Sequence, residues 1–287
     1  MTIPSLDDTI VWIDGAFIGA REASVSVFDH GLTVGDGVFE TMKVTDVGPF
    51  ALERHLRRLH RSLEAMGLSA LPTDAQLLDA IDALIAHNGG AEGNAGRVRI
   101  TITAGDSPLG SGRGTRGSRT VIATGPAATW PPTSHVTVVP WTRNERAASA
   151  GIKSTSYADN VLALRFAQQA GGDEAIFVNT VGDLCEGTGS NIFVVRDGAI
   201  ATPPLASGCL DGITRALVVE ALDQAGVTVD QSPLRIDSLR TCDEAFLTSS
   251  TRDVHPISKV DSVDLPIATG EITRRVMTAF AEFDPAL

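Results

Sequence analysis

The chain has 287 residues, 43% of them hydrophobic, and a formal net charge of −12 at pH 7. This length is large for a single core, so we expect two domains in a globular protein of ordinary composition. The negative charge argues against nucleic acid as a partner, because phosphate binding needs a basic surface, and no apolar stretch approaches the length of a membrane span.

Helices and strands are predicted in mixed order through the first half of the chain. Apolar residues that alternate, or that recur at helical spacing, locate most of them. The first expected elements are a hairpin at 10–18 that turns at Asp14-Gly15, a strand at 38–44 and a turn at 46–48. Two helices follow: one runs through Leu56, Leu59, Leu63 and Met66 and stops at Gly67, and the other, at 73–87, is capped by Thr73 or Asp74. The last expected elements are a strand at 97–103, a loop rich in glycine, serine and arginine at 105–118, and a strand at 119–124.

The second half continues without a regular alternation of strand and helix. The expected elements are strands at 135–140, 174–178, 191–195, 199–202 and 245–248, and helices at 158–170, 213–225 and 270–282. Proline and glycine at 125–134 predict a linker. The mixture favours the α+β class, with a small N-terminal domain at 1–124, an interdomain linker at 125–134 and a larger domain at 135–287.

Neither a disulfide framework nor a metal site is indicated. Cys185, Cys209 and Cys242 are far apart, and the six histidines include no HExxH motif. The opening residues lack the basic and apolar regions of a secretory signal. We therefore expect a cytoplasmic protein without a metal.

Lys153 and Tyr157 lie four residues apart in the segment 151–157, although the chain has only three lysines and one tyrosine. Lysine can give up its proton and form a Schiff base with an aldehyde, which arginine cannot do. A phenol beside it would hydrogen-bond the oxygen of an aromatic cofactor. The alternative is a surface lysine next to a partly buried tyrosine.

Glu186 opens the segment 186–191, with the sequence EGTGSN, which we place between two strands. The glycines let a backbone pass close to a ligand, and a lone carboxylate there would pair with a cationic ring nitrogen. The spacing is not that of a dinucleotide-binding fingerprint. The alternative is an exposed glutamate in a hairpin.

Three segments offer groups that bind an anion. Residues 210–215 open a helix, whose first N–H groups and the Thr214 hydroxyl would hold a phosphate. Residues 248–252 place further hydroxyls at the end of an apolar strand, and Arg58 is a candidate cationic clamp. Alternatively, Thr214 is only the N-cap of the helix. Arg57 and Arg58 point to different faces of a helix, so one of the two would be merely solvated.

Together these segments supply a lysine that traps an aldehyde, a carboxylate for a pyridinium ring and several phosphate donors. These are the requirements of a pyridoxal 5′-phosphate (PLP) site.

The chain resembles the class IV aminotransferase family, the PLP enzymes of fold type IV, from residue 12 to about residue 257. The motifs that carry the resemblance are 35–40, 55–59, Lys153 with Tyr157, 186–191 and 210–215. The resemblance implies an α+β fold with a small N-terminal α/β domain and a larger, β-barrel-like C-terminal domain with helices. It also implies a homodimer in which the partner's small domain completes the substrate pocket.

By the same resemblance, Lys153 would form the Schiff base with PLP and carry the proton between substrate and cofactor. Glu186 would keep the pyridine nitrogen protonated, and Tyr157 would bond the phenolate oxygen. The remaining cofactor residues would be Arg58, Ile213, Thr214, Ser249 and Ser250 at the phosphate and Leu210 against the ring.

The resemblance favours a transaminase that moves an amino group from a D-amino acid or a primary (R)-amine to a keto acid. D-Amino-acid aminotransferases carry a tyrosine where this chain has Phe39 and an arginine where it has Ala104, although His55 is retained. Their substrate-carboxylate trap is therefore incomplete in this chain. Arg99 or Arg252 would replace it, unless each is an ordinary surface or salt-bridged arginine.

Two alternatives stay open. In 4-amino-4-deoxychorismate lyases, which release pyruvate and 4-aminobenzoate, a threonine near the reacting carbon matches Thr41. Thr41 would then be catalytic rather than a residue that merely favours a strand, but Ser249 stands where these lyases often have asparagine. The other alternative is a non-enzymatic, PLP-binding dimer.

Overall fold

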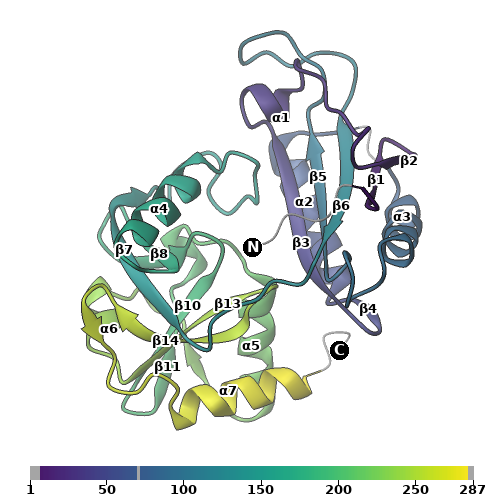
Figure 1. Ribbon diagram of the computed structural model, residues 1–287. Coiled ribbons are helices and arrows are strands. Elements are labelled where there is room, and N and C mark those ends of the chain that lie inside the picture. The colour runs from purple at the N-terminus through teal and green to yellow at the C-terminus, as the bar shows by residue number, and fades with distance from the viewer. Residues whose placement is uncertain (1–6, 70–71, 284–287) are drawn as a thin grey trace. The chain divides into compact units, whose positions relative to one another are not determined.

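The computed structural model describes residues 7–69 and 72–283 (Figure 1). The chain divides into two compact units. We call Met1–Thr129 with Ile152–Tyr157 the N-terminal unit, and Trp130–Gly151 with Ala158–Leu287 the C-terminal unit. The domain limits expected from the sequence stay a prediction. Residues 1–6, which belong to the opening segment read for a secretory signal, lie outside the described residues.

The N-terminal unit is built on a six-stranded antiparallel sheet with the order β2-β1-β6-β5-β3-β4. Its strands are β1 (Ile10–Ile13), β2 (Ala16–Gly19), β3 (Gly37–Thr45), β4 (Gly48–Pro49), β5 (Arg97–Thr103) and β6 (Arg119–Gly125). The predicted hairpin is confirmed: β1 and β2 are joined by Asp14 and Gly15, whose φ angles of 48° and 98° suit a type I′ turn.

The described part of this unit contains three helices: α1 (His30–Thr33), α2 (Leu52–Met66) and α3 (Asp74–His87). The predicted ends of the longer two are confirmed. Gly67 ends α2 in the left-handed conformation, with φ 61°. Thr73 caps α3 in a capping box with Gln76.

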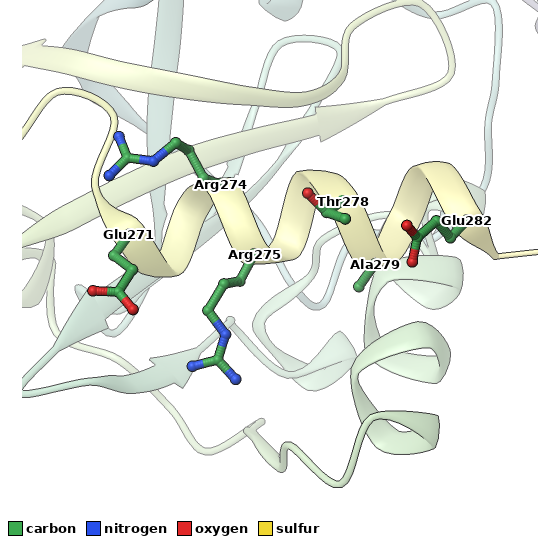
Figure 2. A pocket seen from close by; sticks show the side chains of 6 residues that line it. All are labelled: Glu271, Arg274, Arg275, Thr278, Ala279 and Glu282. Atoms are coloured by element: carbon green, nitrogen blue, oxygen red, sulfur yellow. The ribbon is translucent and has the colours of Figure 1, made fainter.

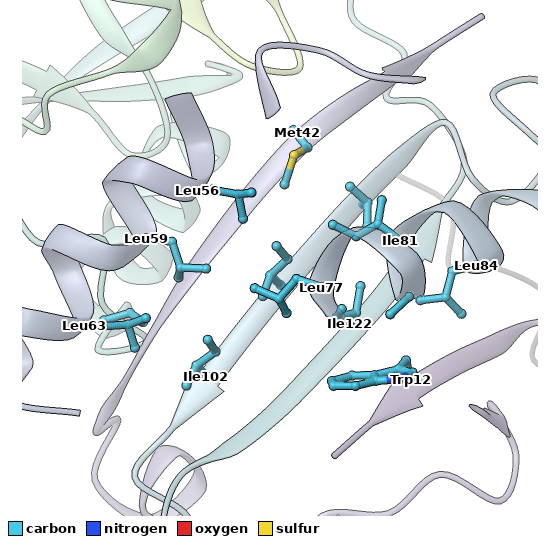
Figure 3. Packing of buried hydrophobic residues seen from close by; sticks show 14 of the residues in the cluster. Trp12, Met42, Leu56, Leu59, Leu63, Leu77, Ile81, Leu84, Ile102 and Ile122 are labelled. Carbon is cyan, nitrogen blue, oxygen red and sulfur yellow. The ribbon is translucent and has the colours of Figure 1, made fainter. Parts of the chain in front are cut away.

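The core of the N-terminal unit lies between one face of the sheet and these two helices. Figure 3 shows leucines of α2 and aliphatic residues of α3 pointing toward side chains of the strands. Each fully buried leucine or isoleucine contributes about 1.5–3 kcal/mol. On β3, Val38 and Met42 face this core, so alternation along the strand turns Phe39 and Thr41 to the opposite face.

The C-terminal unit contains a nine-stranded mixed sheet with the order β12-β11-β10-β13-β14-β7-β8-β9, and β15 pairs with β14. Its strands are β7 (Ser134–Arg143), β8 (Glu174–Asn179), β9 (Leu184–Gly187), β10 (Asn191–Arg196), β11 (Ala199–Ala201), β12 (Val229–Asp230), β13 (Glu244–Ser249), β14 (Asp253–Val260) and β15 (Val263–Asp264). Gly187 N donates to Ser190 O at 2.8 Å. This turn leads β9, at one edge of the sheet, directly into β10, so the sheet curls like part of a barrel.

The helices of this unit are α4 (Ala158–Gln169), α5 (Ile213–Gln224), α6 (Ile236–Arg240) and α7 (Glu271–Glu282), with a 3₁₀ turn η1 (Leu205–Ser207). Ala163 and Ala167 of α4 pack on β7 and β8, while α5 and α7 contact β13. None of the described helices is long and apolar enough to cross a membrane.

The sequence prediction differs from the structure in three main places. β14 was not expected, because Pro256 interrupts its apolar run and proline argues against a strand interior. Glu186 lies within β9 rather than between strands. Gly212, not Thr214, is the N-cap of α5. The short elements α1, α6, η1, β12 and β15 were also not expected.

Candidate active site

Backbone hydrogen bonds fix the segment Ile152–Tyr157 along the start of β3. Phe39 N donates to Lys153 O at 2.9 Å, and Thr155 N donates to Gly37 O at 2.8 Å. The candidate lysine therefore has a defined position next to the strand that carries Phe39 and Thr41.

The amine of Lys153 lies among aromatic rings and near a second cation. Its Nζ is 4.3 Å from the Phe39 ring centroid and 5.9 Å from that of Tyr157, and the two rings meet edge to face at 5.2 Å. The guanidinium of Arg99 lies 3.6 Å from the same Phe39 centroid. Four residues predicted from the sequence are thus brought together within the N-terminal unit.

Strand pairing adds Thr41 to this group. Thr41 lies opposite Arg99, and Phe39 lies opposite Thr101, in the antiparallel register of β3 and β5. Residues paired in this way project from the same face of a sheet. Arg99 Nε also donates to Thr101 Oγ1 at 3.2 Å. We call Lys153, Tyr157, Phe39, Thr41 and Arg99 the lysine cluster.

His55 and Arg58 lie on the other face of the sheet, where both contact Glu40. Arg58 donates through Nε and Nη2 to the two carboxylate oxygens of Glu40, each at 2.7 Å, and His55 Nδ1 lies 2.7 Å from Oε2. All three side chains are buried. The structure does not bring His55 to the face that carries Phe39.

This buried triad has strongly perturbed acid–base properties. Burial alone would raise the pKa of Glu40, but the hydrogen bonds and charge of Arg58, helped by His55, lower it from 4.5 to about 2. Burial lowers the pKa of His55, against the opposite effect of Glu40. Glu40 lies in the motif 35–40, but the sequence alone indicates no role for it.

Glu186 is held from two sides within the C-terminal unit. Leu210 N donates to its Oε2 at 2.9 Å, and Arg143 Nε lies 3.2 Å from its Oε1. Arg143 is itself fixed: it stacks 4.4 Å from the Phe177 ring centroid and donates to Asn160 Oδ1 at 3.1 Å. The structure therefore orients the carboxylate and places a cation beside it. No sequence signal singled out Arg143.

The start of α5 has the features of an anion site. The N-cap, Gly212, has no side chain and so makes no capping hydrogen bond to the first N–H groups, which point out of the helix end. A Cβ on the N-cap, Gly212, would clash with Asn191 Oδ1. Asn191 Nδ2 in turn donates to Leu210 O at 2.9 Å. Thr214 lies in the first turn and is buried.

The end of β13 lies beside this helix start, because Thr248 pairs with Asn191 in the register of β13 and β10. The Thr248 hydroxyl is buried, and no described group hydrogen-bonds it. Ser249 and Ser250 follow as half-buried hydroxyls, and Ser249 Oγ accepts from Arg252 N at 3.2 Å. An uncapped helix start, a glycine with no room for a side chain and an unsatisfied hydroxyl fit the phosphate of PLP.

Arg252 is a buried, salt-bridged arginine. The sequence left this open as the alternative to a clamp for the substrate carboxylate. Its Nη1 donates to Ser134 Oγ at 2.9 Å and Asp173 Oδ1 at 3.3 Å, and its Nη2 lies 3.5 Å from Glu174 Oε2. The guanidinium also stacks 3.7 Å from the Trp130 ring centroid. To reach a substrate, this side chain would first have to leave all of these partners.

A shallow hollow elsewhere on the C-terminal unit is unrelated to these residues. Figure 2 shows that it runs along α7 alone, lined by Glu271, Arg274, Arg275, Thr278, Ala279 and Glu282. No predicted site residue lines it. Across residues 7–69 and 72–283, no group of three or more His, Cys, Asp or Glu side chains could hold a metal ion.

Comparison with known proteins identifies the family. Residues 37–260 match the model of the family described as amino-transferase class IV. The chain belongs to this class IV aminotransferase family, as its motifs predicted.

Relatives with three different names align over nearly the whole chain. A putative branched-chain-amino-acid aminotransferase of Methanocaldococcus jannaschii is 32% identical and covers 95% of both chains. An aminodeoxychorismate lyase of Bacillus subtilis is also 32% identical, over 92% of this chain and 91% of its own. A D-alanine aminotransferase of Staphylococcus epidermidis is 28% identical, over 96% and 98%.

Solved structures confirm the α+β, fold type IV architecture. The branched-chain amino acid aminotransferase of Escherichia coli superposes with a TM-score of 0.88 at 26% identity, covering 96% of this chain and 94% of its own. The PLP form of the enzyme from Thermobaculum terrenum has a TM-score of 0.84 at 29% identity, over 97% and 94%.

Proposed function

We propose that the protein is a PLP-dependent transaminase that moves an amino group from a D-amino acid or a primary (R)-amine to a keto acid. The observation that carries this proposal is the lysine cluster, in which a lysine amine and the Arg99 guanidinium lie at 4.3 Å and 3.6 Å from one phenylalanine ring. A transaminase of amino acids needs both groups, an amine that bonds the cofactor and a cation that binds the substrate carboxylate.

The cofactor would be held by residues whose geometry suits its parts. We propose that the first N–H groups of α5, at Ile213 and Thr214, bind the phosphate with Ser249 and Ser250, and that Arg58 contributes from its pair with Glu40. Thr248, with its unsatisfied hydroxyl, joins this set. Leu210 would pack against the ring. The solved relative in its PLP form supports the same cofactor.

Each remaining residue then has a chemical task. When bound, PLP supplies an electron sink for the bonds at the substrate Cα. Lys153 would bond the cofactor covalently, and its Nζ would carry the proton. Glu186, oriented by Leu210 N–H and Arg143, would hold the ring nitrogen with its carboxylate, and Tyr157 would donate to the phenolate oxygen. Arg99 binds the substrate carboxylate.

A panel of amino donors tests the proposal. Addition of D-alanine or a primary (R)-amine should remove the visible absorption band of the purified protein, and pyruvate should restore it. L-Leucine belongs in the panel, because a branched-chain aminotransferase is among the relatives. A response to L-leucine alone would reject the proposed stereochemistry, and silence toward every donor would reject the transaminase.

A lyase is the second candidate, since Thr41 lies opposite Arg99 within the lysine cluster and a relative is an aminodeoxychorismate lyase. Release of 4-aminobenzoate and pyruvate from aminodeoxychorismate would support it. A non-enzymatic PLP-binding dimer is the third candidate, and multiple turnovers with any substrate would reject it.

We further propose that the protein forms a homodimer. Val27, Phe28 and Leu32 are 70%, 52% and 65% exposed in the N-terminal unit, and Val161 and Leu162 project from α4 in the C-terminal unit. Clusters of exposed apolar side chains usually mark interfaces. Light scattering should give twice the mass of the chain, and a monomeric mass at micromolar concentration would contradict the dimer.

We also propose that the protein works in the cytoplasm. Its three cysteines are free and buried, which suits a compartment that keeps thiols reduced. Burial raises the pKa of Cys209 and of Cys242 to about 11, so neither is a reactive thiolate near neutral pH.

A further inference from the structure

We propose that Glu174, a buried carboxylate with no role in the chemistry described above, is a positioning residue for Glu186. Glu174 would act by holding the turn of residues 187–190, which joins β9 to β10. The inference deepens the proposed function, because it concerns the carboxylate assigned to the ring nitrogen of PLP.

Glu174 is the first residue of β8, and its side chain is 3% exposed. Its Oε1 accepts hydrogen bonds from Thr188 N at 3.0 Å and from the Thr188 hydroxyl. Its Oε2 accepts one from Ser190 Oγ at 3.1 Å. A single buried carboxylate therefore binds both hydroxyl residues of the turn.

Gly187 allows this close approach. A Cβ at Gly187 would clash with Ser190 Oγ and lie 3.2 Å from the carboxylate carbon of Glu174. Contacts within the protein thus explain why the motif 186–191 contains a glycine and two hydroxyl residues at these positions. Gly187 leaves room for the carboxylate, and the hydroxyls of Thr188 and Ser190 are used by Glu174 rather than offered to a ligand.

The charge of Glu174 is balanced within the same network. Arg252 Nη2 lies 3.5 Å from Glu174 Oε2, and the Arg252 side chain is 5% exposed. Removing one member of a buried ion pair leaves the other uncompensated, which is strongly destabilising. The ion pair with Glu174 therefore explains the position of Arg252, which the sequence predicts as a substrate clamp.

The turn matters to Glu186 because it continues directly from β9, the short strand that carries this carboxylate. β9 is four residues long and forms the edge of the sheet, and its pairing with β8 shifts register just after Phe177, the partner of Glu186. Asn160 strengthens the connection, since it donates to Thr188 O and also accepts from Arg143, the cation beside Glu186. Loosening the turn should therefore let the Glu186 carboxylate move.

Glu174→Ala tests the inference, with Glu244→Ala as the matched control. Glu244 is also a buried glutamate of the C-terminal unit, and it accepts from Ile272 N and Thr273 N, at 3.2 and 2.8 Å, at the start of α7. Both variants should be less stable than the wild type, but only Glu174→Ala should disturb the turn.

Two measurements on the full chain separate positioning from general destabilisation. In Glu174→Ala, amide hydrogen exchange at Thr188 should accelerate by about tenfold or more, because the N–H loses its acceptor. The pH midpoint of the bound cofactor's visible band should shift by about one unit, in the same direction as in Glu186→Gln. Glu244→Ala should keep the wild-type value in both measurements. Glu174→Gln retains one acceptor oxygen, so its exchange rate at Thr188 and its band midpoint should lie between those of Glu174→Ala and the wild type.

If Glu174→Ala does not fold, Ser190→Ala replaces it, because this variant removes one donor and keeps the ion pair with Arg252. It should give the same two changes at smaller size. The proposal would be overturned if the folded Glu174→Ala or Ser190→Ala variant kept both the exchange rate and the band midpoint of the wild type. It would also be overturned if Glu244→Ala changed both quantities as much as Glu174→Ala does. A wild-type protein without any cofactor band would instead reject the proposed function, and the exchange result would then decide alone whether Glu174 holds the turn.

Discussion

Arg58 and Glu40 form a two-point ion pair with both hydrogen bonds at 2.7 Å, and the two side chains are 5% and 1% exposed. The pair joins α2 to β3, the strand that lies beside the Lys153 segment. A charge that loses its partner in such a setting stays desolvated without compensation.

Glu40→Gln should therefore destabilise the protein by about 3–5 kcal/mol. The free energy of unfolding, obtained from denaturant titration, is the quantity to compare. Glu64→Gln is the matched control, because Glu64 lies on the exposed side of α2. A loss in Glu40→Gln no larger than in the control would show that the pair contributes little.

The same pair predicts how stability depends on pH. The pKa of Glu40 is lowered from 4.5 to about 2 on folding, so its contribution is fully present above about pH 4.5 and is lost as the pH falls toward 2. Glu40→Gln lacks this titration. The difference in unfolding free energy between wild type and variant should shrink between pH 4.5 and pH 2, and a constant difference would contradict the lowered pKa.

Arg99→Ala should raise KM for donors that carry a carboxylate by about 10- to 100-fold, the loss expected for a charge-assisted hydrogen bond. KM for simple primary amines should stay unchanged, because these donors have no carboxylate for Arg99 to bind. Steady-state kinetics with paired donors, such as D-alanine and an (R)-amine, provide the measurement. An equal effect on both donors would show that Arg99 is not the carboxylate clamp.

Arg252→Ala should behave differently. Its partners Asp173 and Glu174 would lose their counter-charge, so the expected effect is a lower unfolding free energy, by about 3–5 kcal/mol, with KM affected alike for both kinds of donor. A stable variant with a raised KM for carboxylate donors alone would instead make Arg252 the clamp.

Gly212→Ala should weaken PLP binding, since the new methyl group would displace Asn191 and with it the start of α5. A loss of about 10-fold or more in affinity is expected, because helix-end donors must be placed accurately to bind a phosphate. Equilibrium titration of the cofactor-free protein with PLP measures it. Gly19→Ala is the control, because a Cβ there meets nothing within 4 Å and Gly19 belongs to β2 of the N-terminal unit.

Local chemistry explains which parts of the fold could be predicted. The turn at Asp14-Gly15 and the capping box of Thr73 depend on residues close in sequence, and both are found as expected. β14 could not be recognised, because Pro256 suppresses the strand signal and only pairing with β13 and β7 reveals it.

In the candidate site, too, features set by residues close in sequence could be predicted, and features set by tertiary contacts could not. Lysine and tyrosine four residues apart predicted a site at Lys153, and the structure adds what lies beside it, Phe39 and Arg99. The pairing of Arg252 with Glu174 joins residues 78 positions apart, and that of Arg143 with Glu186 joins residues 43 apart. Such tertiary contacts leave no periodic trace in the sequence. A salt-bridged Arg252 was therefore only one of the alternatives, its partners could not be named, and Arg143 was not predicted at all.

Lys153→Ala should lose covalent attachment of the cofactor and lower turnover by on the order of 10⁴-fold, the upper range for a group that transfers a proton. Some PLP should remain bound through the phosphate contacts. Lys259→Ala is the control, because Lys259 lies on β14 in the C-terminal unit. Turnover of Lys153→Ala near the wild-type rate would remove Lys153 from the chemistry.

The most direct test of the account is to locate the covalent bond itself. Reduction of the PLP-loaded protein with borohydride, followed by peptide mapping, should find the phosphopyridoxyl group on the peptide that contains Lys153. Its attachment to Lys43 or Lys259, or to no lysine, would contradict the account.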